Sequence, residues 1–179
     1  MTSSILAWSV FALLVFWAVG AYNRLMRLRS EVNTCFSDVQ GQLQQQAQLA
    51  LSLAAPTDPQ EAEDESPFLT QIRVASTQLA ACLETVRPKP LDHERVAAIV
   101  SASAVLTRAW ERAEREDAHD LAGPQLPSEL IDTRARLVRD TQAAITQFDA
   151  AVVRYNAAIA QFPALLLARV FSFKPGRPF

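Results

Sequence analysis

An uncharged apolar segment near the N-terminus constrains this chain more than any other feature. Residues 5–22 read ILAWSVFALLVFWAVGAY and contain no charged side chain. As a helix, this segment would be about 27 Å long, close to the thickness of the hydrocarbon core of a bilayer. Trp8, Trp17 and Tyr22 are residue types that sit at membrane interfaces. The segment therefore predicts a transmembrane anchor over residues 1–22.

A cleaved secretory signal peptide is the competing interpretation of the same segment. Ala18 and Gly20 are small residues of the kind found at cleavage sites, but the preceding MTSS has no Lys or Arg for a basic n-region. Arg24, Arg27 and Arg29 follow the apolar run. Because arginine-rich flanks stay in the cytoplasm, we expect a retained, single-pass anchor with the rest of the chain on the cytoplasmic side.

Beyond the anchor, apolar residues recur at alternating steps of three and four positions, the pattern of helices that pack nearly antiparallel. Four such series each predict the buried face of one helix. They are Leu25, Leu28, Val32, Cys35, Val39, Leu43, Ala47 and Ala50; Leu69, Ile72, Ser76, Leu79, Leu83 and Val86; Val96, Ile99, Ser103, Leu106, Trp110 and Ala113; and Val138, Thr141, Ile145, Phe148, Val152, Tyr155, Ile159 and Phe162. The chain has only 4 glycines, so composition also favours helix. The sequence predicts an all-α fold: an N-terminal transmembrane helix that continues into an antiparallel up-down four-helix bundle over residues 23–163.

Prolines and acidic residues mark the connections between these helices. They fall at APTDPQEAEDESP (residues 55–67), PKP (88–90) and AGPQLPSE (122–129), where Ser128 is the expected N-cap of the fourth helix. The first and fourth helices would be about 50 Å long and the second about 30 Å. The corner at 88–90 should therefore stop short of the membrane. Near this membrane end, the foot of the bundle, part of the apolar face would stay open to a protein partner or a second copy.

Charge is distributed unevenly along the predicted rod, although the formal net charge is only −2. The acidic residues expected at the distal end are Asp58, Glu61, Glu63, Asp64, Glu65, Glu114, Glu116, Asp117 and Asp120. The basic residues expected at the membrane surface are Arg24, Arg27, Arg29, Arg169, Lys174 and Arg177. Such a foot would be attracted to an anionic leaflet; the alternative is a chance scatter of charge on solvated faces. The near-zero net charge does not indicate a nucleic-acid partner.

The C-terminal segment, residues 164–179, is apolar and basic: ALLLARVFSFKPGRPF. Pro163 cannot continue a helical hydrogen-bond ladder, so the fourth helix should end or kink near Phe162 and residues 164–173 should form a separate short segment. One interpretation places this segment at the lipid surface, with its basic side chains reaching the phosphates. The other is that its apolar residues cap the foot of the bundle.

The sequence contains few groups of residues that could support catalysis or bind a metal. Glu116 and His119 have the Glu-x-x-His spacing of di-iron bundles, but a second such motif is missing, and His93, the other histidine, follows Pro90 closely. Cys35 and Cys82 have no metal or redox spacing. No glycine-containing nucleophile elbow or phosphate loop is present. We predict no catalytic residue, cofactor or metal, and hence no enzyme.

Two Tyr-Asn pairs carry a family resemblance. YNRLMRLRSEV at 22–32 and RYNAAIAQFP at 154–163 resemble motifs of the LemA family of bacterial membrane proteins. The matching positions are Tyr22, Asn23, Leu25 and Val32 after the anchor, and Tyr155, Asn156, Ile159, Phe162, Pro163 and Ala168 near the end. The chain departs from the family after Val39, where QQQAQLALSLAAP replaces a basic pair and a DLIPNLV-like run. It also has Phe148-Asp149 in place of an earlier Tyr-Asn pair.

The resemblance implies a bacterial inner-membrane protein with an N-terminal membrane helix, a helical bundle and no established enzymatic activity. From the residues alone, Tyr155 is expected to pack in the core with its hydroxyl bonded across the interface, the alternative being a binding role. An antiparallel bundle would bring Tyr22 and Asn23 to the level of Tyr155 and Asn156, where the two pairs could lock together.

Two functions follow from these observations. The first is a non-catalytic, membrane-anchored scaffold or adaptor that organises an unidentified protein partner or membrane shape. The second is a sensor or small-ligand-binding bundle with an extracytoplasmic domain and a pocket between helices. The side of the membrane on which the bundle lies separates them.

Overall fold

The computed structural model describes residues 2–54, 67–84, 91–119, 127–162 and 164–179, although the side chains of residues 2–5, 7, 10, 67, 68 and 116–119 lie outside the described part. These residues form helices and no strand, which confirms the all-α prediction. The helices are α1 (Thr2–Leu53), α2 (Pro67–Glu84), α3 (His93–His119), α4 (Ser128–Ala160) and α5 (Ala164–Val170).

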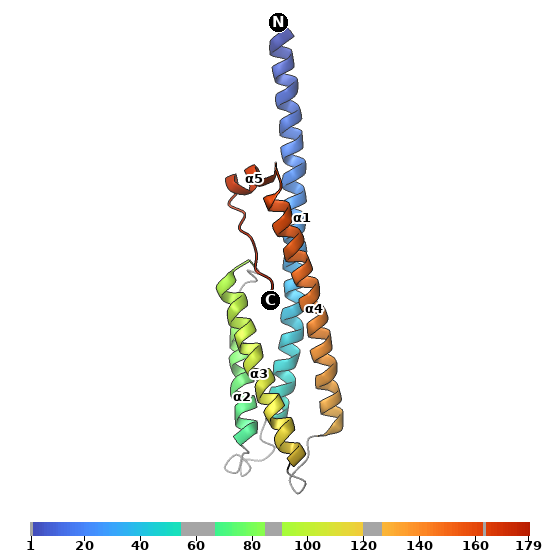
Figure 1. The fold of residues 1–179 in the computed structure, drawn as a ribbon, viewed down its shortest axis with the longest axis vertical. Helices are drawn as coiled ribbons and strands as arrows, with labels where there is room; N and C mark the ends of the chain where they lie inside the picture. The colour runs from blue at the N-terminus through green and yellow to red at the C-terminus, as the bar shows by residue number, and fades with distance from the viewer. Residues whose placement is uncertain (1, 55–66, 85–90, 120–126, 163) are drawn as a thin grey trace.

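Helix α1 is 52 residues long and extends far beyond the other helices at its N-terminal end (Figure 1). Its protruding part exposes large apolar side chains: Leu6, Trp8, Phe11, Leu13, Leu14, Val15, Phe16, Trp17 and Val19. The described side chains of α1 are continuous only from Phe11. Among the described residues, no single helix is long and apolar enough to cross a membrane. The pair α4 and α5 passes that test together, but the two helices are bent by 95°.

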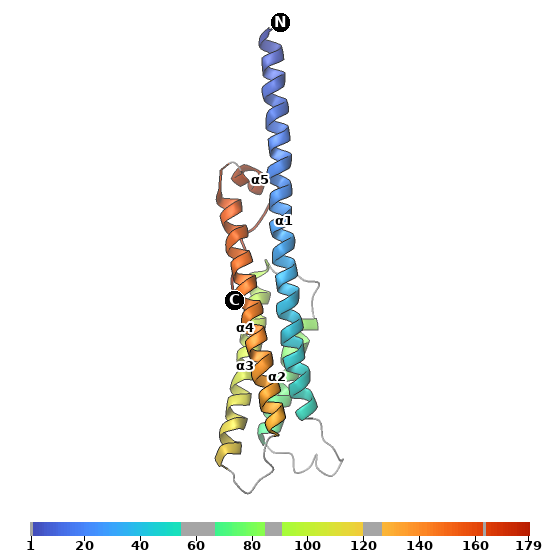
Figure 2. The same cartoon turned by 90° about the vertical axis from the view of Figure 1, so that its right-hand side faces the viewer.

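The lower part of α1 is the centre of an up-down bundle (Figures 1 and 2). It packs against α4 and α2, and α3 packs against α2. Between α3 and α4, Arg134 forms an ion pair of 2.5 Å with Glu114 and lies 5.3 Å from the ring centroid of Trp110. Helix α1 is tied to α4 by Gln46, whose side-chain Nε2 donates to Thr141 Oγ1 and to the carbonyl of Leu137.

The predicted apolar series form most of the core. Leu25, Val32, Val39, Ile72, Leu79, Val96, Leu106, Phe148, Val152 and Tyr155 are all buried. Two members of the fourth series were placed wrongly: Val138 and Phe162 are exposed. Phe36, which no series included, is buried because its ring packs 5.6 Å from that of Phe148.

Two helix starts can be compared with the sequence signals. Pro67 begins α2, a position that suits proline because the first helical N–H has no intrahelical partner. Ser128 was expected to cap α4, but it is the first helical residue, and Pro127 occupies the cap position without a side-chain hydrogen bond. Backbone bonds from Leu130 and Ile131 to the Pro127 carbonyl close this first turn instead.

The foot of the bundle, where part of the apolar face was expected to stay open, is partly covered. Helix α5 packs against α4 and α1, and the chain after it descends along the bundle between its helices (Figure 1). Residues 171–179, here called the tail, therefore cover part of the faces that α2 and α3 are too short to reach. The prediction that residues 164–173 form a separate short segment is confirmed over residues 164–170, which are α5.

Candidate functional site: the docked C-terminal tail

A tight reversal sends the tail back toward the bundle. The amide of Phe173 donates to the carbonyl of Ala168 at 2.9 Å, and Ser172 between them has a φ of 54°. A hydrogen bond from an amide to the carbonyl five residues earlier, next to a residue with left-handed backbone angles, is typical of the Schellman motif. This motif ends a helix and turns the chain. Glycine is the usual residue at the left-handed position, so serine holds the turn at an energetic cost.

Polar side chains of α4 then bind the backbone of the tail. Asn156 Nδ2 donates to the Gly176 carbonyl at 2.8 Å, and the Gly176 amide donates to Asn156 Oδ1 at 2.9 Å. The Tyr155 hydroxyl donates to the Lys174 carbonyl at 3.2 Å, and the Phe179 amide donates to Asp149 Oδ1 at 2.8 Å. The carboxamide of Asn156 thus bonds both backbone groups of one residue, much as a neighbouring strand would.

Apolar contacts fix the same segment from the other side. The ring of Phe179 stands edge-on to that of Phe148 at 5.4 Å and lies 6.5 Å from that of Phe36. Gly176 is buried, and a Cβ added to it would lie 2.7 Å from Leu91 Cδ2 and 3.3 Å from a Val152 methyl carbon. A Cβ at this position would force the Leu91 side chain to shift.

The beginning of α3 also contacts the tail. His93 Nε2 lies 3.2 Å from the carbonyl oxygen of Pro175, so that this ring nitrogen donates when it carries the proton. Because Leu91 packs beside Gly176, the tail joins the start of α3 to the last turns of α4. It links these two helices at a level that α2 does not reach.

At the foot, the tail reaches α1. The ring of Tyr22 lies 5.1 Å from that of Phe171 and 6.2 Å from that of Phe173. The guanidinium carbon of Arg29 lies 5.9 Å from the centroid of Phe173, within the range of a cation–π contact. The Tyr-Asn pairs at 22 and 155 therefore both contact the tail, each from a different helix.

The C-terminal segment caps part of the foot of the bundle and also leaves several apolar side chains exposed. Ala168 is buried and Phe173 is half-buried, so part of the segment caps the bundle. Four large apolar side chains of the segment are exposed: Leu165, Leu166, Val170 and Phe171. The same segment thus closes the foot and presents an apolar surface outward.

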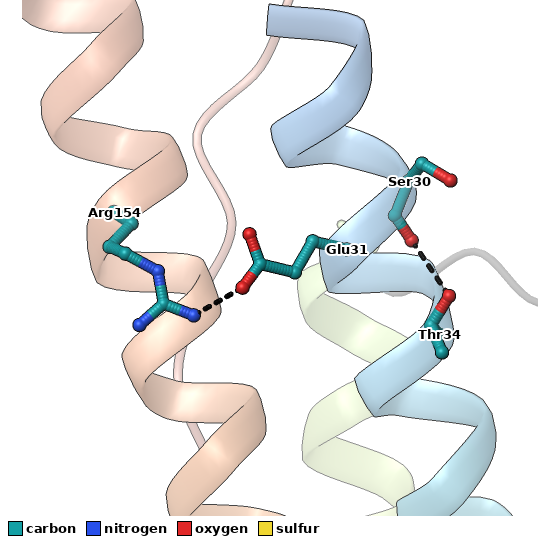
Figure 3. Close-up of polar contacts among 4 residues, drawn as sticks. All are labelled: Ser30, Glu31, Thr34 and Arg154. Atoms are coloured by element: carbon teal, nitrogen blue, oxygen red, sulfur yellow. Dashed lines mark hydrogen bonds and ion pairs between the residues drawn. The ribbon is translucent and has the colours of Figure 1, made fainter. Parts of the chain in front are cut away.

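Charged side chains surround the site, and two of them contact the tail: Asp149 accepts the hydrogen bond from Phe179, and Arg29 lies over the ring of Phe173. Arg24, Arg27, Arg29, Arg169, Lys174 and Arg177 are all exposed. Glu31 on α1 and Arg154 on α4 form an ion pair of 2.5 Å across the helix interface (Figure 3). In Figure 3, Thr34 bonds the carbonyl of Ser30 within α1, on the side away from Arg154. The exposed ion pair contributes about 0.2–1 kcal/mol.

Two ionisable groups near the site are shifted toward their neutral forms. Burial raises the pKa of the Tyr155 hydroxyl, only partly opposed by Arg29. Burial, followed by the charges of Glu31 and Asp38, raises the pKa of the Cys35 thiol. A raised thiol pKa disfavours the thiolate that nucleophilic chemistry requires. The Tyr155 hydroxyl stays a donor, as its bond to the tail demands.

The remaining sequence-selected residues are distributed along the rod. Trp8 and Trp17 are exposed on the protruding part of α1, Leu25 and Val32 are buried, and Asn23 is exposed. Pro163 and the side chains of Glu116 and His119 lie outside the described residues. Over the described part of the chain, no three His, Cys, Asp or Glu side chains gather in a way that could hold a metal ion.

The sequence analysis assigned no contact with the tail to Phe36, Leu91 or Asp149, and none within the tail to Gly176 or Phe179. The tail's FKPGRPF contains two prolines around a glycine, which excludes a helix. That feature, together with the length mismatch between the helices, was the available signal that an extended segment could fill the foot.

Comparison with known proteins gives one match. The model of the LemA family matches residues 35–179, which include α2 to α5, the tail and α1 from Cys35 onward. No curated protein and no solved structure matches the chain. The family match covers well over half of the sequence, and it contains every α4 residue that holds the tail. The chain belongs to the LemA family.

Proposed function

We propose that this protein is a non-catalytic scaffold or adaptor, anchored in the bacterial inner membrane by the N-terminal part of α1. One observation carries the proposal: α1 runs without a break from an exposed apolar stretch into the centre of the bundle. Exposed apolar surface of this extent is costly in water and marks an interaction with lipid or protein. A helix shared by anchor and core would hold the bundle at a fixed distance from the bilayer.

The charges support a cytoplasmic bundle. Arg24, Arg27 and Arg29 are exposed on α1 directly after the apolar run, and Arg169 is exposed on α5 beside it. Basic residues at this position favour the cytoplasmic side and an anionic leaflet. In this arrangement the distal faces of α2, α3 and α4 extend into the cytoplasm, where protein partners would bind.

Site-specific photo-crosslinking in membranes tests the scaffold. A photoreactive residue is placed at the exposed positions Gln78 on α2, Gln142 on α4 and Arg169 on α5, one at a time, in the full chain. We expect discrete protein adducts from one face, and the same adducts when residues 5–22 are replaced by an unrelated apolar helix of equal length. If no face yields a discrete protein adduct, the scaffold proposal fails.

A sensor remains the second candidate because of a groove between α2 and α3. It has a volume of about 540 Å³, within the range of small-molecule sites. Three arginines and one glutamate border it: Arg108, Arg112, Arg115 and Glu111. The Nη1 of Arg112 donates to Gln71 Oε1 at 3.0 Å. This groove would suit an anionic small molecule if the bundle lay outside the cytoplasm.

Topology separates the two candidates. Since Phe179 packs against Phe36 and Phe148, a distal cysteine is a better reporter than a C-terminal fusion. In a chain with Cys35→Ala, Cys82→Ala and Gln142→Cys, the scaffold predicts that a membrane-impermeant maleimide labels only after the membrane is opened. Labelling of intact spheroplasts would favour the sensor.

A further inference from the structure

A groove lies where α1 leaves the bundle and α4 ends. It has a volume of about 480 Å³. It is lined by α1 between Leu13 and Leu25, and by Gln161, Phe162 and Ala164 where α4 ends and α5 begins. The groove is separate from the docked tail, whose contacts lie on other residues of these helices.

The body of the groove is apolar and open. A Cβ added at Gly20 would meet nothing within 4 Å. Phe16 is 80% exposed and Phe162 79% exposed, the largest exposed fractions among the large apolar side chains described. These rings stand in space that the protein leaves unfilled, although Phe162 belongs to a series whose other members are mostly buried.

The chemistry of the groove changes along α1. Leu13 marks its apolar end and Arg24, the only charged residue in the lining, marks the other. The two lie 11 positions apart, about 16 Å along a helix. If residues 5–22 cross the bilayer, Leu13 lies in the hydrocarbon region and Arg24 at the level of the lipid phosphates. Polar Gln161 lies in the lining as well, on the α4 side.

We propose that this groove binds one anionic glycerophospholipid from the bilayer, with its phosphate at Arg24 and an acyl chain along Phe16, Gly20 and Phe162. This inference rests on the proposed membrane anchor and deepens it by naming a ligand. The charge complementarity between Arg24 and a lipid phosphate, and the direction of the groove relative to the bilayer, select a lipid over a second protein helix.

Native mass spectrometry of the full chain, released from micelles doped with equal amounts of phosphatidylglycerol and phosphatidylcholine, tests the site. The wild type should retain one phosphatidylglycerol in preference to phosphatidylcholine by about fivefold. Arg24→Gln should bring that ratio close to one. Gly20→Leu should reduce retention of both lipids because its side chain would fill the groove, while Arg139→Gln, at an exposed position of α4 away from the lining, should leave the ratio unchanged. Inorganic phosphate in excess should not displace the lipid, since the acyl contacts hold it.

Equal retention of the two lipids by the wild type, or an equal loss in Arg24→Gln and Arg139→Gln, would overturn the lipid site. So would displacement by phosphate. Circular dichroism melts of each variant show whether the bundle is intact. The anchor is scored separately, by the fraction of each chain found in membranes: membrane-bound chains with no lipid preference refute the site alone, whereas a wild-type chain absent from membranes refutes both proposals.

Discussion

Asn156 and Gly176 form the most specific contact between the tail and the bundle. The carboxamide satisfies both backbone groups of Gly176, and the missing side chain of Gly176 lets the tail fit between Leu91 and Val152. Asn156 could be selected from the sequence because of the Tyr-Asn pattern. Its partner could not, because a side chain that bonds backbone leaves no pattern in the residue type of the partner.

Removal of the Asn156 carboxamide should loosen the tail. We expect Asn156→Ala to lower the free energy of unfolding by about 1–3 kcal/mol, because two partly buried hydrogen bonds are lost. Urea unfolding of the detergent-solubilised full chain measures this, and amide exchange at Gly176 should accelerate. Asn33→Ala, at an exposed position of α1, is the matched control and should have little effect. Slow exchange at Gly176 in Asn156→Ala would contradict the docking contact.

A methyl group at Gly176 should be destabilising. Gly176→Ala would bring a Cβ within 2.7 Å of Leu91 Cδ2, and we expect a loss of about 1–3 kcal/mol in the same unfolding assay. Leu91→Ala in addition should recover part of that loss. The control is Gly41→Ala, where a Cβ meets nothing within 4 Å inside α1, so stability should rise by about 0.5–1 kcal/mol. Equal effects at both glycines would show that the tail does not pack there.

At the level of elements, the helix series were readable from the sequence and the tail was not. Three- and four-residue spacing identified most of the buried faces of α1 to α4, because each face depends only on its own helix. Whether the foot stays open depends on which segment fills it, and that is a tertiary property. Phe36 and Phe179 illustrate the limit. Phe36 is buried and Phe179 is half-buried, and the two rings lie against each other although they are far apart in the sequence.

The turn after α5 gives a prediction at this scale. Ser172 has a φ of 54°, a conformation that costs a non-glycine residue about 1–2 kcal/mol. Ser172→Gly should therefore raise the free energy of unfolding by up to about 1 kcal/mol, less the entropy that glycine adds to the unfolded chain. Ser101→Gly, in the exposed interior of α3, should act in the opposite direction. If both substitutions destabilise, the turn is not left-handed in solution.

Over the whole molecule, the structure describes only part of the predicted separation between basic residues at the foot and acidic residues at the distal end. The basic residues are exposed around the foot and along the tail, but most of the acidic ones, including residues 58–65 and 116–120, lie outside the described side chains. Glu114 is described, and it pairs with Arg134 rather than standing free at the distal end. The family and the all-α bundle were predictable because both leave local patterns. A partner surface leaves no such local pattern, because its residues come together only in the folded bundle.

The central claim is that the N-terminal part of α1 is embedded in the membrane, and alkaline carbonate extraction of cell membranes tests it most directly. Carbonate strips peripheral proteins and leaves embedded ones. The full chain should remain in the membrane pellet, and a chain lacking residues 2–22 should move to the supernatant, because the apolar run would be the only embedded part. Release of the full chain into the supernatant would contradict the account.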